Sequence, residues 1–284
     1  FKQKKILNIN SKQYKKWRSI MEEWISQGIE IYKRIRPRTP PLAVKLVKDS
    51  KEIPDGVLRP LKDFGGGMLM CQVWNMAREY GWTIGMTYED VKGLCPAPIA
   101  FGWGELEDEA DIAKAWIEFN LYSNLEVAKK VLDGVPKFKK GEYAGMVVSP
   151  IEQAKMTADV IMVYCNPAAA MVLAVVSLYK RGKRIVSDTD GIMSCTDSII
   201  KSMLEGEPTV AIPGYGEKKW SRTQDDEMIF SIPRESLGEI IDGFNAIQFG
   251  YPMPIPPVLM ARPLAVPIRV PPPVPPPYTK MRWK

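Results

Sequence analysis

Apolar residues recur along this chain with two different periods, and prolines and glycines mark where one period gives way to the other. From Ser11 to Ile35 the apolar positions keep a near-heptad spacing, which predicts one long amphipathic helix. Such a helix packs across the body or against another subunit. The prolines at positions 37, 40 and 41 end it, and the alternating stretch from Leu42 to Val47 predicts the first strand.

Short apolar runs and helical segments then alternate through the body. The further predicted strands are the run containing Trp82, Ile84 and Met86, and the runs Met146–Ser149, Val160–Tyr164, Thr209–Ile212 and Met228–Ile232. Asn166 as N-cap and Pro167 as first helical residue predict a helix to Lys180, and a last helix is predicted from Glu235 to Ile247. The runs at 146–149 and 160–164 are close enough to pair without a long crossover. We therefore expect an α/β or α+β fold, with a mixed sheet and flanking helices.

Two predicted helices begin with a cysteine. The triplet Gly65-Gly66-Gly67 leads into apolar positions at helical spacing, which places Cys71 in the first turn, and Cys195 has the same place in a later helix. Each helix follows a strand and a glycine-containing loop and precedes a glycine and a short strand. The order predicts two similar halves. The triplet lacks the Lys-Ser/Thr of a phosphate-binding loop, so a tight turn is favoured over a phosphate cradle.

The composition changes after residue 250. Residues 251–277 are dense in proline, with apolar side chains between the prolines, and favour an extended polyproline arm. A pre-extended chain loses little entropy on docking, so we expect the arm to contact another chain. The predicted organisation is an N-terminal helix (1–36), a body (37–250) and the arm (251–284). The expected partner is a second copy of the chain or a larger enzyme complex.

Composition and charge narrow the classes of function. The chain has 284 residues, of which 45% are hydrophobic, and its net charge of +6 comes largely from its two ends. No motif for reading bases accompanies this charge, so nucleic acid is a disfavoured partner. The uncharged run 160–179 is split by Asn166-Pro167 and does not predict a membrane span. Widely spaced cysteines and an N-terminus without a signal-peptide apolar region favour the cytoplasm.

The cysteines are the main candidates for chemistry. Unpaired N–H groups and the helix dipole favour a thiolate at Cys71, while Cys95 opens a Cys-Pro-Ala-Pro turn. The chain has no histidine, so thiolates are its obvious metal ligands. Three thiolates from separate loops, Cys71, Cys95 and Cys195, suit an iron–sulfur cluster with one iron left open. Free cysteine is also among the most buried residue types, so packing or metal-free thiol chemistry stays open.

Because the chain has no histidine, any general acid–base catalysis must use Asp, Glu, Lys, Tyr or Cys side chains. Asp225, Asp226 and Glu227 stand just before a predicted strand and are candidate acids, bases or ligands for a hard cation. Solvated residues at the entry of a strand are the alternative reading. Asp197, two residues after Cys195, is either an ordinary first-turn acid or a residue that supports the cysteine site.

Several short motifs together resemble one family. They are Cys71-Gln72, Gly81-Trp82-Thr83-Ile84, Cys95-Pro96, Asn166-Pro167, Ser194-Cys195-Thr196-Asp197-Ser198 and Thr223-Gln224-Asp225-Asp226-Glu227-Met228. This set is similar to the archaeal and bacterial domain-of-unknown-function family 169, over roughly residues 37–247. The resemblance implies a cytoplasmic protein of a kind frequent in anaerobes, whose activity has no settled description. It also implies that Cys71, Cys95 and Cys195 fall on family motifs, whereas Cys165 stands where glycine is usual and the proline arm is a departure.

Two classes of function follow from these patterns. The first is a redox-type protein that binds an iron–sulfur cluster through Cys71, Cys95 and Cys195 and serves as an electron-transfer or catalytic subunit of a larger complex. The second is a non-enzymatic binding or assembly subunit with buried structural cysteines. The sequence names no substrate for either class.

Overall fold

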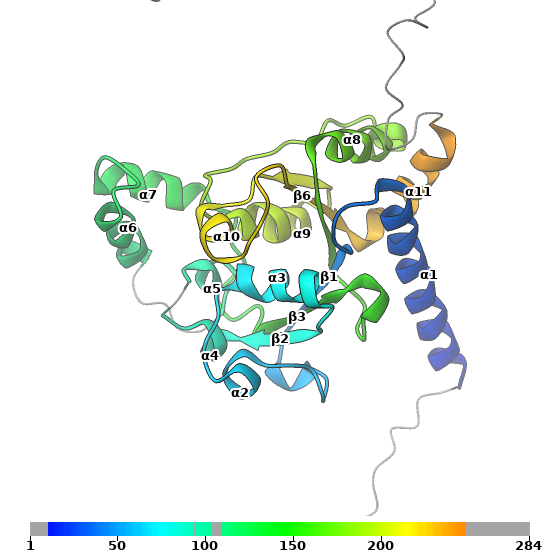
Figure 1. Cartoon of the computed structure of the whole chain (residues 1–284), viewed down its shortest axis with the longest axis horizontal. Coiled ribbons are helices and arrows are strands. Elements are labelled where there is room, and N and C mark those ends of the chain that lie inside the picture. The colour runs from blue at the N-terminus through cyan, green and yellow to red at the C-terminus, as the bar shows by residue number, and fades with distance from the viewer. Residues whose placement is uncertain (1–10, 94, 104–108, 248–284) are drawn as a thin grey trace, which may run out of the picture. The chain divides into compact units, whose positions relative to one another are not determined.

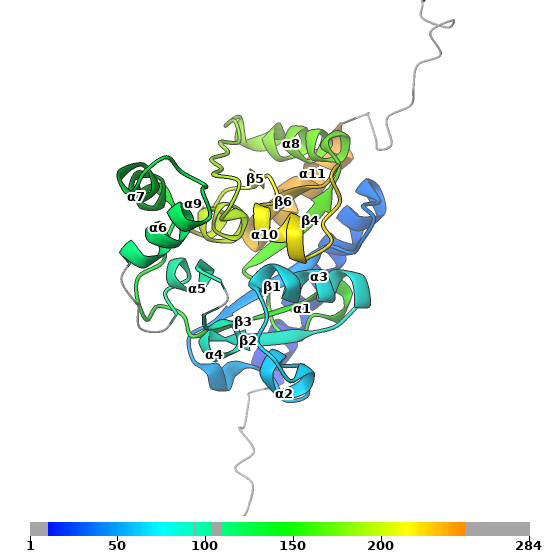
Figure 2. The same cartoon turned by 60° about the vertical axis from the view of Figure 1, so that its left-hand side comes forward.

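A six-stranded sheet runs through the part of the chain that the computed structural model describes, residues 11–93, 95–103 and 109–247. Its strands are β1 (Leu42–Val47), β2 (Ile84–Thr87), β3 (Gly145–Pro150), β4 (Val160–Cys165), β5 (Thr209–Ala211) and β6 (Met228–Pro233). They lie in the order β2-β3-β1-β4-β6-β5, and all six are labelled in Figure 2. The sheet and its flanking helices confirm the α+β prediction, and β3 to β6 lie within one residue of the predicted runs.

The register shows which strands meet at the centre. Val44 of β1 stands opposite Val148 of β3 on one side and Val160 of β4 on the other, and all ladders between the named strands are antiparallel. The expected direct pairing of β3 with β4 is therefore wrong, because β1 lies between them and takes the hydrogen bonds of both. The parallel component of the expected mixed sheet is limited, in the described residues, to a bridge between Leu58 and Ile84.

The strand order has an internal symmetry. Reading from each edge, the first half runs β2-β3-β1 and the second half runs β5-β6-β4. In both halves the first strand in sequence is central, the second is at the edge and the third lies between them. A cysteine-bearing helical segment separates the first strand from the second in each half. The two halves predicted from the sequence thus share one strand topology, and β1 and β4 join them.

Helices cover both faces of the sheet. One face packs against α1 (Ser11–Ile35), α8 (Pro167–Arg181) and α11 (Leu237–Ala246), and the last two lie side by side (Figures 1 and 2). The opposite face, which we call the thiol face, packs against α3 (Met70–Tyr80), a π-helical turn (Thr196–Ile200) continued by α9 (Lys201–Glu205), and α5 (Ala97–Ala100). The six-residue α10 (Tyr215–Trp220) contacts α3. The two larger apolar cores of the described residues lie one on each side of the sheet.

The remaining helices are short or lie beside the sheet. They are α2 (Pro60–Phe64), α4 (Tyr88–Val91), α6 (Glu109–Glu118), α7 (Leu125–Gly134), and the 3₁₀ turns Ser50–Glu52, Ile151–Gln153 and Arg234–Ser236. Gly65 ends α2 with φ of 73°, a left-handed conformation that glycine adopts without strain. The first residue of the glycine triplet therefore ends a helix, in keeping with the tight turn expected there.

Predicted helix signals are present at α1 and α8. The side chain of Asn166 accepts a hydrogen bond from the backbone N–H of Ala169 at 2.9 Å, and Pro167 is the first residue of α8, as predicted. α1 spans the predicted residues, and its buried Trp24, Ile31 and Ile35 join the core on its side of the sheet. Burying side chains of this size contributes roughly 1.5–3 kcal/mol each. This contribution fixes the later turns of α1 against the body.

The predicted arm lies outside the described residues. No helix in the described ranges is long and apolar enough to cross a membrane. The uncharged run 160–179 consists instead of β4 and most of α8, as the Asn166-Pro167 break predicted.

Candidate thiol site

Cys71 and Cys95 meet at the N-terminus of α3. Cys71 is the second residue of α3, as predicted, and is 8% exposed. Cys95 belongs to the loop between α4 and α5. Burial raises the pKa of Cys95, while the backbone N–H groups of Ala97 and Met70 act on its sulfur in the opposite direction. Since Met70 begins α3, the Cys95 sulfur lies at the same helix end as Cys71.

Cys195 reaches the same region from the second half of the chain. It stands in the helical turn that begins at Ser194 and continues into the π-helical turn 196–200, and it is 8% exposed. Burial is the largest cause that raises the pKa of Cys195, and the charges of Cys95, Glu217 and Cys71 raise it further. The structure therefore brings the three predicted cysteines within electrostatic range of one another. π-Helical turns of this kind are frequent at functional sites.

The expected thiolate at a helix N-terminus is wrong for this structure. The pKa of Cys71 is raised well above its ordinary value, first by burial and then by the charges of Glu217 and Cys95, although backbone N–H groups act to lower it. Removal from water disfavours the charged form more strongly than the N–H groups of one helix end favour it. The raised pKa values of Cys71, Cys95 and Cys195 accordingly favour the protonated form of each thiol at neutral pH.

Glu217 is the polar centre of the site. It is 2% exposed, on α10, and its carboxylate accepts hydrogen bonds from Trp74 Nε1 at 3.0 Å, the Tyr164 hydroxyl at 2.5 Å and Ser194 Oγ at 2.6 Å. The backbone N–H of Gly214 donates a fourth, at 3.2 Å. Trp74 follows Cys71 by three residues on α3, and Ser194 directly precedes Cys195. One carboxylate thus ties together the two segments that carry these cysteines.

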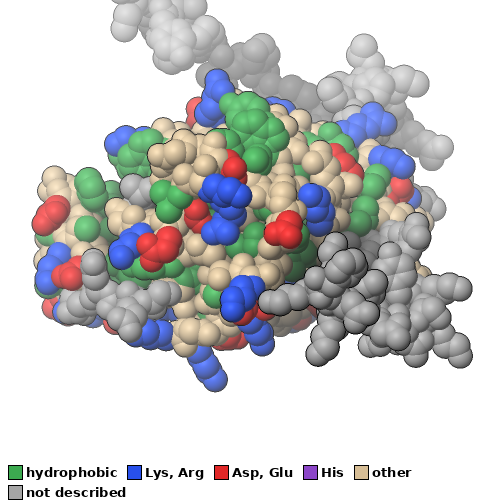
Figure 3. Space-filling model, turned by 90° about the horizontal axis from the view of Figure 1, so that it is seen from below, with side chains coloured by type: hydrophobic (Ala, Val, Ile, Leu, Met, Phe, Trp, Pro, Cys, Tyr) green, Lys and Arg blue, Asp and Glu red, His purple; other side chains and the backbone are tan. Residues whose placement is uncertain are grey.

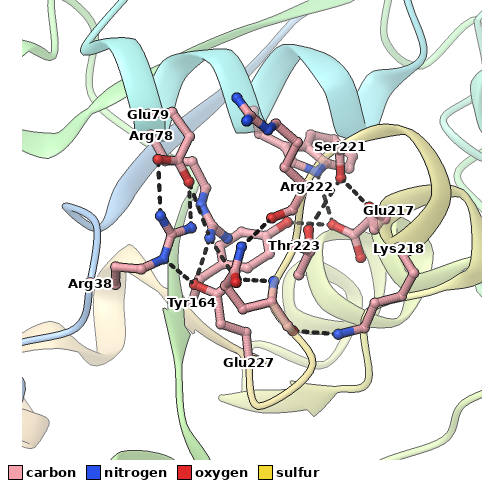
Figure 4. Close-up of polar contacts among 12 residues, drawn as sticks. Arg38, Arg78, Glu79, Tyr164, Glu217, Lys218, Ser221, Arg222, Thr223 and Glu227 are labelled. Atoms are coloured by element: carbon pink, nitrogen blue, oxygen red, sulfur yellow. Dashed lines mark hydrogen bonds and ion pairs between the residues drawn. The ribbon is translucent and has the colours of Figure 1, made fainter.

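A second buried pair extends the polar network from Tyr164. The guanidinium carbon of Arg78 lies 3.8 Å from the centroid of the Tyr164 ring, and Arg78 Nη2 donates to both carboxylate oxygens of Glu227 at 2.6 Å (Figure 4). Burial tends to raise the pKa of Glu227, but the hydrogen bond and charge of Arg78 outweigh it, so that this pKa is lowered. Nε and Nη1 of Arg78 are buried and have no hydrogen-bond partner among the described residues.

Asp197 is buried beside Cys195. It is 4% exposed, and its Oδ2 has no hydrogen-bond partner within the described ranges. Burial, followed by the charge of Asp190, raises the pKa of Asp197 to about 7. In turn the charge of Asp197 raises the pKa of Cys195. The structure therefore places Asp197 within electrostatic range of the cysteine site, whereas an ordinary first-turn acid would be solvated.

The three acids before β6 have different environments. Glu227 is buried and paired with Arg78, whereas Asp225 and Asp226 are exposed. Asp226 and Glu227 line a cavity of about 90 Å³ at the start of α8, together with Arg36 and Arg38. Asp225 and Asp226 are thus ordinary solvated residues at the entry of a strand, as the alternative interpretation of the sequence expected. Glu227 belongs to the buried network.

Cys165 lies apart from the other three cysteines. It follows Tyr164 on β4, and successive side chains of a strand point to opposite faces, so Cys165 enters the core beneath α1, α8 and α11. Burial raises its pKa to about 12. Within the described ranges, no group of three or more His, Cys, Asp or Glu side chains is arranged to hold a metal ion.

The residues that join the cysteines are absent from the sequence-based candidates. Glu217, Trp74, Tyr164 and Arg78 come from three distant elements. Trp74 and Arg78 follow Cys71 at positions i+3 and i+7 on α3, a spacing that places all three on one helix face. This spacing could have indicated that Trp74 and Arg78 lie near the Cys71 thiol. Glu217 stands three residues after the N-cap Gly214 of a short helix, a position that also suits an ordinary capping acid.

An antiparallel α+β body with three thiols on one face of its sheet defines the structural class of this protein. The chain belongs to the domain-of-unknown-function family 169, described as uncharacterised ArCR, whose model matches residues 30–243. It is 27% identical over 210 residues to the uncharacterised protein MJ0308 of Methanocaldococcus jannaschii, covering 72% of this chain and 87% of that relative. No solved structure matches the chain.

Proposed function

We propose that this chain is a cytoplasmic redox-type protein that binds an iron–sulfur cluster through Cys71, Cys95 and Cys195. The observation that supports the proposal is the mutual electrostatic influence of three thiols that come from separate segments of the chain. A cluster held by three thiolates keeps one iron open and supplies electron transfer or a site for substrate. The protein would then act as an electron-transfer or catalytic subunit of a larger complex.

Protonation and charge set the conditions for binding. Because the raised pKa values favour protonated thiols, ligation must release their protons, and metal affinity should rise with pH. The N–H groups of Met70 and Ala97 already act on the Cys95 sulfur in the sense that favours its charged form. The charge of Glu217 raises the pKa of Cys71 and Cys195 and so disfavours their thiolate forms. The positive charge of bound iron would offset this effect. Ligation also requires the sulfurs to close around the cluster.

The test is to purify the full chain without oxygen and to measure iron and acid-labile sulfide per chain. The single variants Cys71→Ser, Cys95→Ser and Cys195→Ser should each lose most of both. Cys165→Ser is the matched control, because this buried thiol lies on the other face of the sheet, and it should retain both. A wild-type chain without iron, or equal loss in all four variants, contradicts the proposal.

The second function is a non-enzymatic binding or assembly subunit with structural cysteines. The observation that favours it is that burial raises the pKa of all four thiols, as expected for cysteines that only pack. In that case the purified protein should be colourless and should co-purify with a larger enzyme. Iron and sulfide at stoichiometric amounts would exclude this alternative.

A further inference from the structure

The short helix α10 covers the thiol of Cys71. A Cβ added to Gly216 of α10 would lie 3.8 Å from Cys71 Sγ, so the helix backbone rests almost directly on this sulfur. Cys71 and Cys195 are each 8% exposed, and an iron ion can bind both only if a covering element moves. On the face of the body seen from below, basic and acidic side chains are interspersed with hydrophobic ones, and no region of one charge marks another entrance for an ion (Figure 3).

α10 is attached to the body mainly by polar contacts. Of its six residues, Glu217 is the buried one. The aromatic side chains of α10 face outwards instead, with Tyr215 50% exposed and Trp220 47% exposed. Helices in proteins are stabilised chiefly by burial of an apolar face, and α10 buries little apolar surface. An element with few buried apolar contacts opens at a low cost in free energy.

The Glu217 carboxylate makes the contacts that hold α10 in place. It accepts hydrogen bonds from Trp74 of α3, Tyr164 of β4 and Ser194, which precedes the π-helical turn. All three bonds join α10 to other elements. One side chain therefore keeps the helix closed over Cys71, and the loss of its donors should release the helix.

The start of α10 has a separate attachment. The backbone N–H of Tyr215 donates to the carbonyl oxygen of Gly191 at 2.8 Å. A Cβ added to Gly214 would lie 2.5 Å from the carbonyl oxygen of Ile192, so the chain is packed closely against that loop. These backbone contacts do not involve Glu217 and provide a fixed end about which the rest of α10 can move. A helix of six residues is too short to persist alone, so α10 should unwind when it detaches.

We propose that α10 is a lid over the thiol site, held closed by Glu217 and opened to admit iron to the cysteines. The identity of what enters rests on the proposed function, whereas the opening itself does not. In the closed state the backbone at Gly216 separates the Cys71 sulfur from water. In the open state Cys71 is solvated and its proton can be released to ligation.

Thiol labelling of the full chain, prepared without iron, measures the opening. N-Ethylmaleimide adds an exposed thiol across its carbon–carbon double bond, and mass spectrometry of the peptides gives the rate at each cysteine. Tyr164→Phe and Ser194→Ala each delete one hydroxyl that donates to Glu217. Each variant should accelerate labelling of Cys71 about fivefold, the change in open population expected for one lost hydrogen bond.

The matched control is Ser177→Ala. This variant also deletes a buried hydroxyl, which donates to the carbonyl oxygen of Leu173 at 2.7 Å, but on α8 beneath the other face of the sheet. Labelling of Cys71 in this control should match the wild type. The rate at Cys165, in the same distant core, should stay unchanged in every variant, because a local opening does not expose it.

Gly216→Ala should have the opposite effect. The added methyl group meets Cys71 Sγ at 3.8 Å and the Trp220 ring at 4.0 Å, which are ordinary contact distances. Alanine also favours a helix more than glycine does, so this variant should slow labelling of Cys71 about fivefold. A substitution that merely loosens the fold cannot slow the reaction.

Two results overturn the proposal. The first is an equal rate at Cys71 in the wild type, Tyr164→Phe, Ser194→Ala and Gly216→Ala. The second is acceleration of Cys71 and Cys165 together, which shows that the thiol is exposed by unfolding of the whole body. Because labelling is measured without iron, its failure leaves the iron and sulfide measurement unaffected, and a chain that binds no iron can still show the opening of α10.

Discussion

Removing the carboxylate of Glu217 should destabilise the protein strongly, whereas removing only its charge should not. In Glu217→Ala, three buried side-chain donors lose their acceptor: Trp74 Nε1, the Tyr164 hydroxyl and Ser194 Oγ. A buried donor without a partner costs about 1–3 kcal/mol, so losing the acceptor of three donors should lower the free energy of unfolding by about 3–9 kcal/mol. That is a large part of the roughly 5–15 kcal/mol available to a typical domain.

The amide variant separates hydrogen bonding from charge. Trp74 and Tyr164 both donate to Oε1, which Glu217→Gln retains as an acceptor. Ser194 meets the other oxygen and can reverse its hydroxyl to accept from the new amide, but the backbone N–H of Gly214 cannot. One donor is then lost and charge-assisted bonds become neutral, which should cost about 1–2 kcal/mol.

Urea unfolding monitored by tryptophan fluorescence measures both changes. Glu235→Gln, at a side chain that is 68% exposed, is the control and should lie within about 0.5 kcal/mol of the wild type. A Glu217→Ala variant within about 1 kcal/mol of the wild type refutes the role of Glu217 as the acceptor that joins the two cysteine segments. An amide variant as unstable as the alanine variant shows that the charge, and not the hydrogen bonds, stabilises the site.

Three further predictions concern other parts of the body. Asp197 has a pKa of about 7 in the folded state, against 3.8 for an unperturbed aspartate. The free energy of unfolding should therefore fall as pH rises between these two values, by at most about 4 kcal/mol. In urea titrations, Asp197→Asn should remove this pH dependence, whereas the control Asp225→Asn should keep it. Arg78→Met should cost about 3 kcal/mol, because it removes the nearest cation from buried Glu227 and leaves only the more distant Arg38, whose Nε lies 3.5 Å away. Adding Glu227→Gln should recover part of this loss in a double-mutant cycle. Gly243→Ala should lower the melting temperature, because the new Cβ would lie 2.3 Å from the carbonyl oxygen of Val176, whereas Gly134→Ala, with nothing within 4 Å, should not.

The predictable part of the fold is the part that local patterns determine. The cap of α8 at Asn166 and the ends of β3 to β6 follow from turn residues and side-chain alternation, which act within a few positions. Which strands become neighbours is a different matter. The insertion of β1 between β3 and β4 depends on pairings between residues about 100 or more positions apart, such as Leu42 with Pro150. Proximity along the chain alone favoured the wrong neighbour.

For the site, the sequence identified the helix positions of Cys71 and Cys195 but not the environment that governs their chemistry. Helix position is a local property, whereas burial depends on α5, α10 and the sheet, which together remove water from the thiols. The same distinction explains why Glu217 escaped notice. Three of its four donors, Trp74, Tyr164 and Ser194, come from other elements that meet α10 only in the folded chain.

The shared strand order of the two halves bears on how the site is assembled. Only three residue pairs, from Leu42 opposite Met162 to Val44 opposite Val160, form the β1–β4 ladder that joins the halves. A chain cut between β3 and β4 would yield two three-stranded fragments, each with a bare strand edge and with Cys71 and Cys95 on one piece and Cys195 on the other. Neither fragment alone would contain the complete set of thiols. The three thiols therefore come together only when the two halves have folded against each other, and the proposed cluster would depend on that junction.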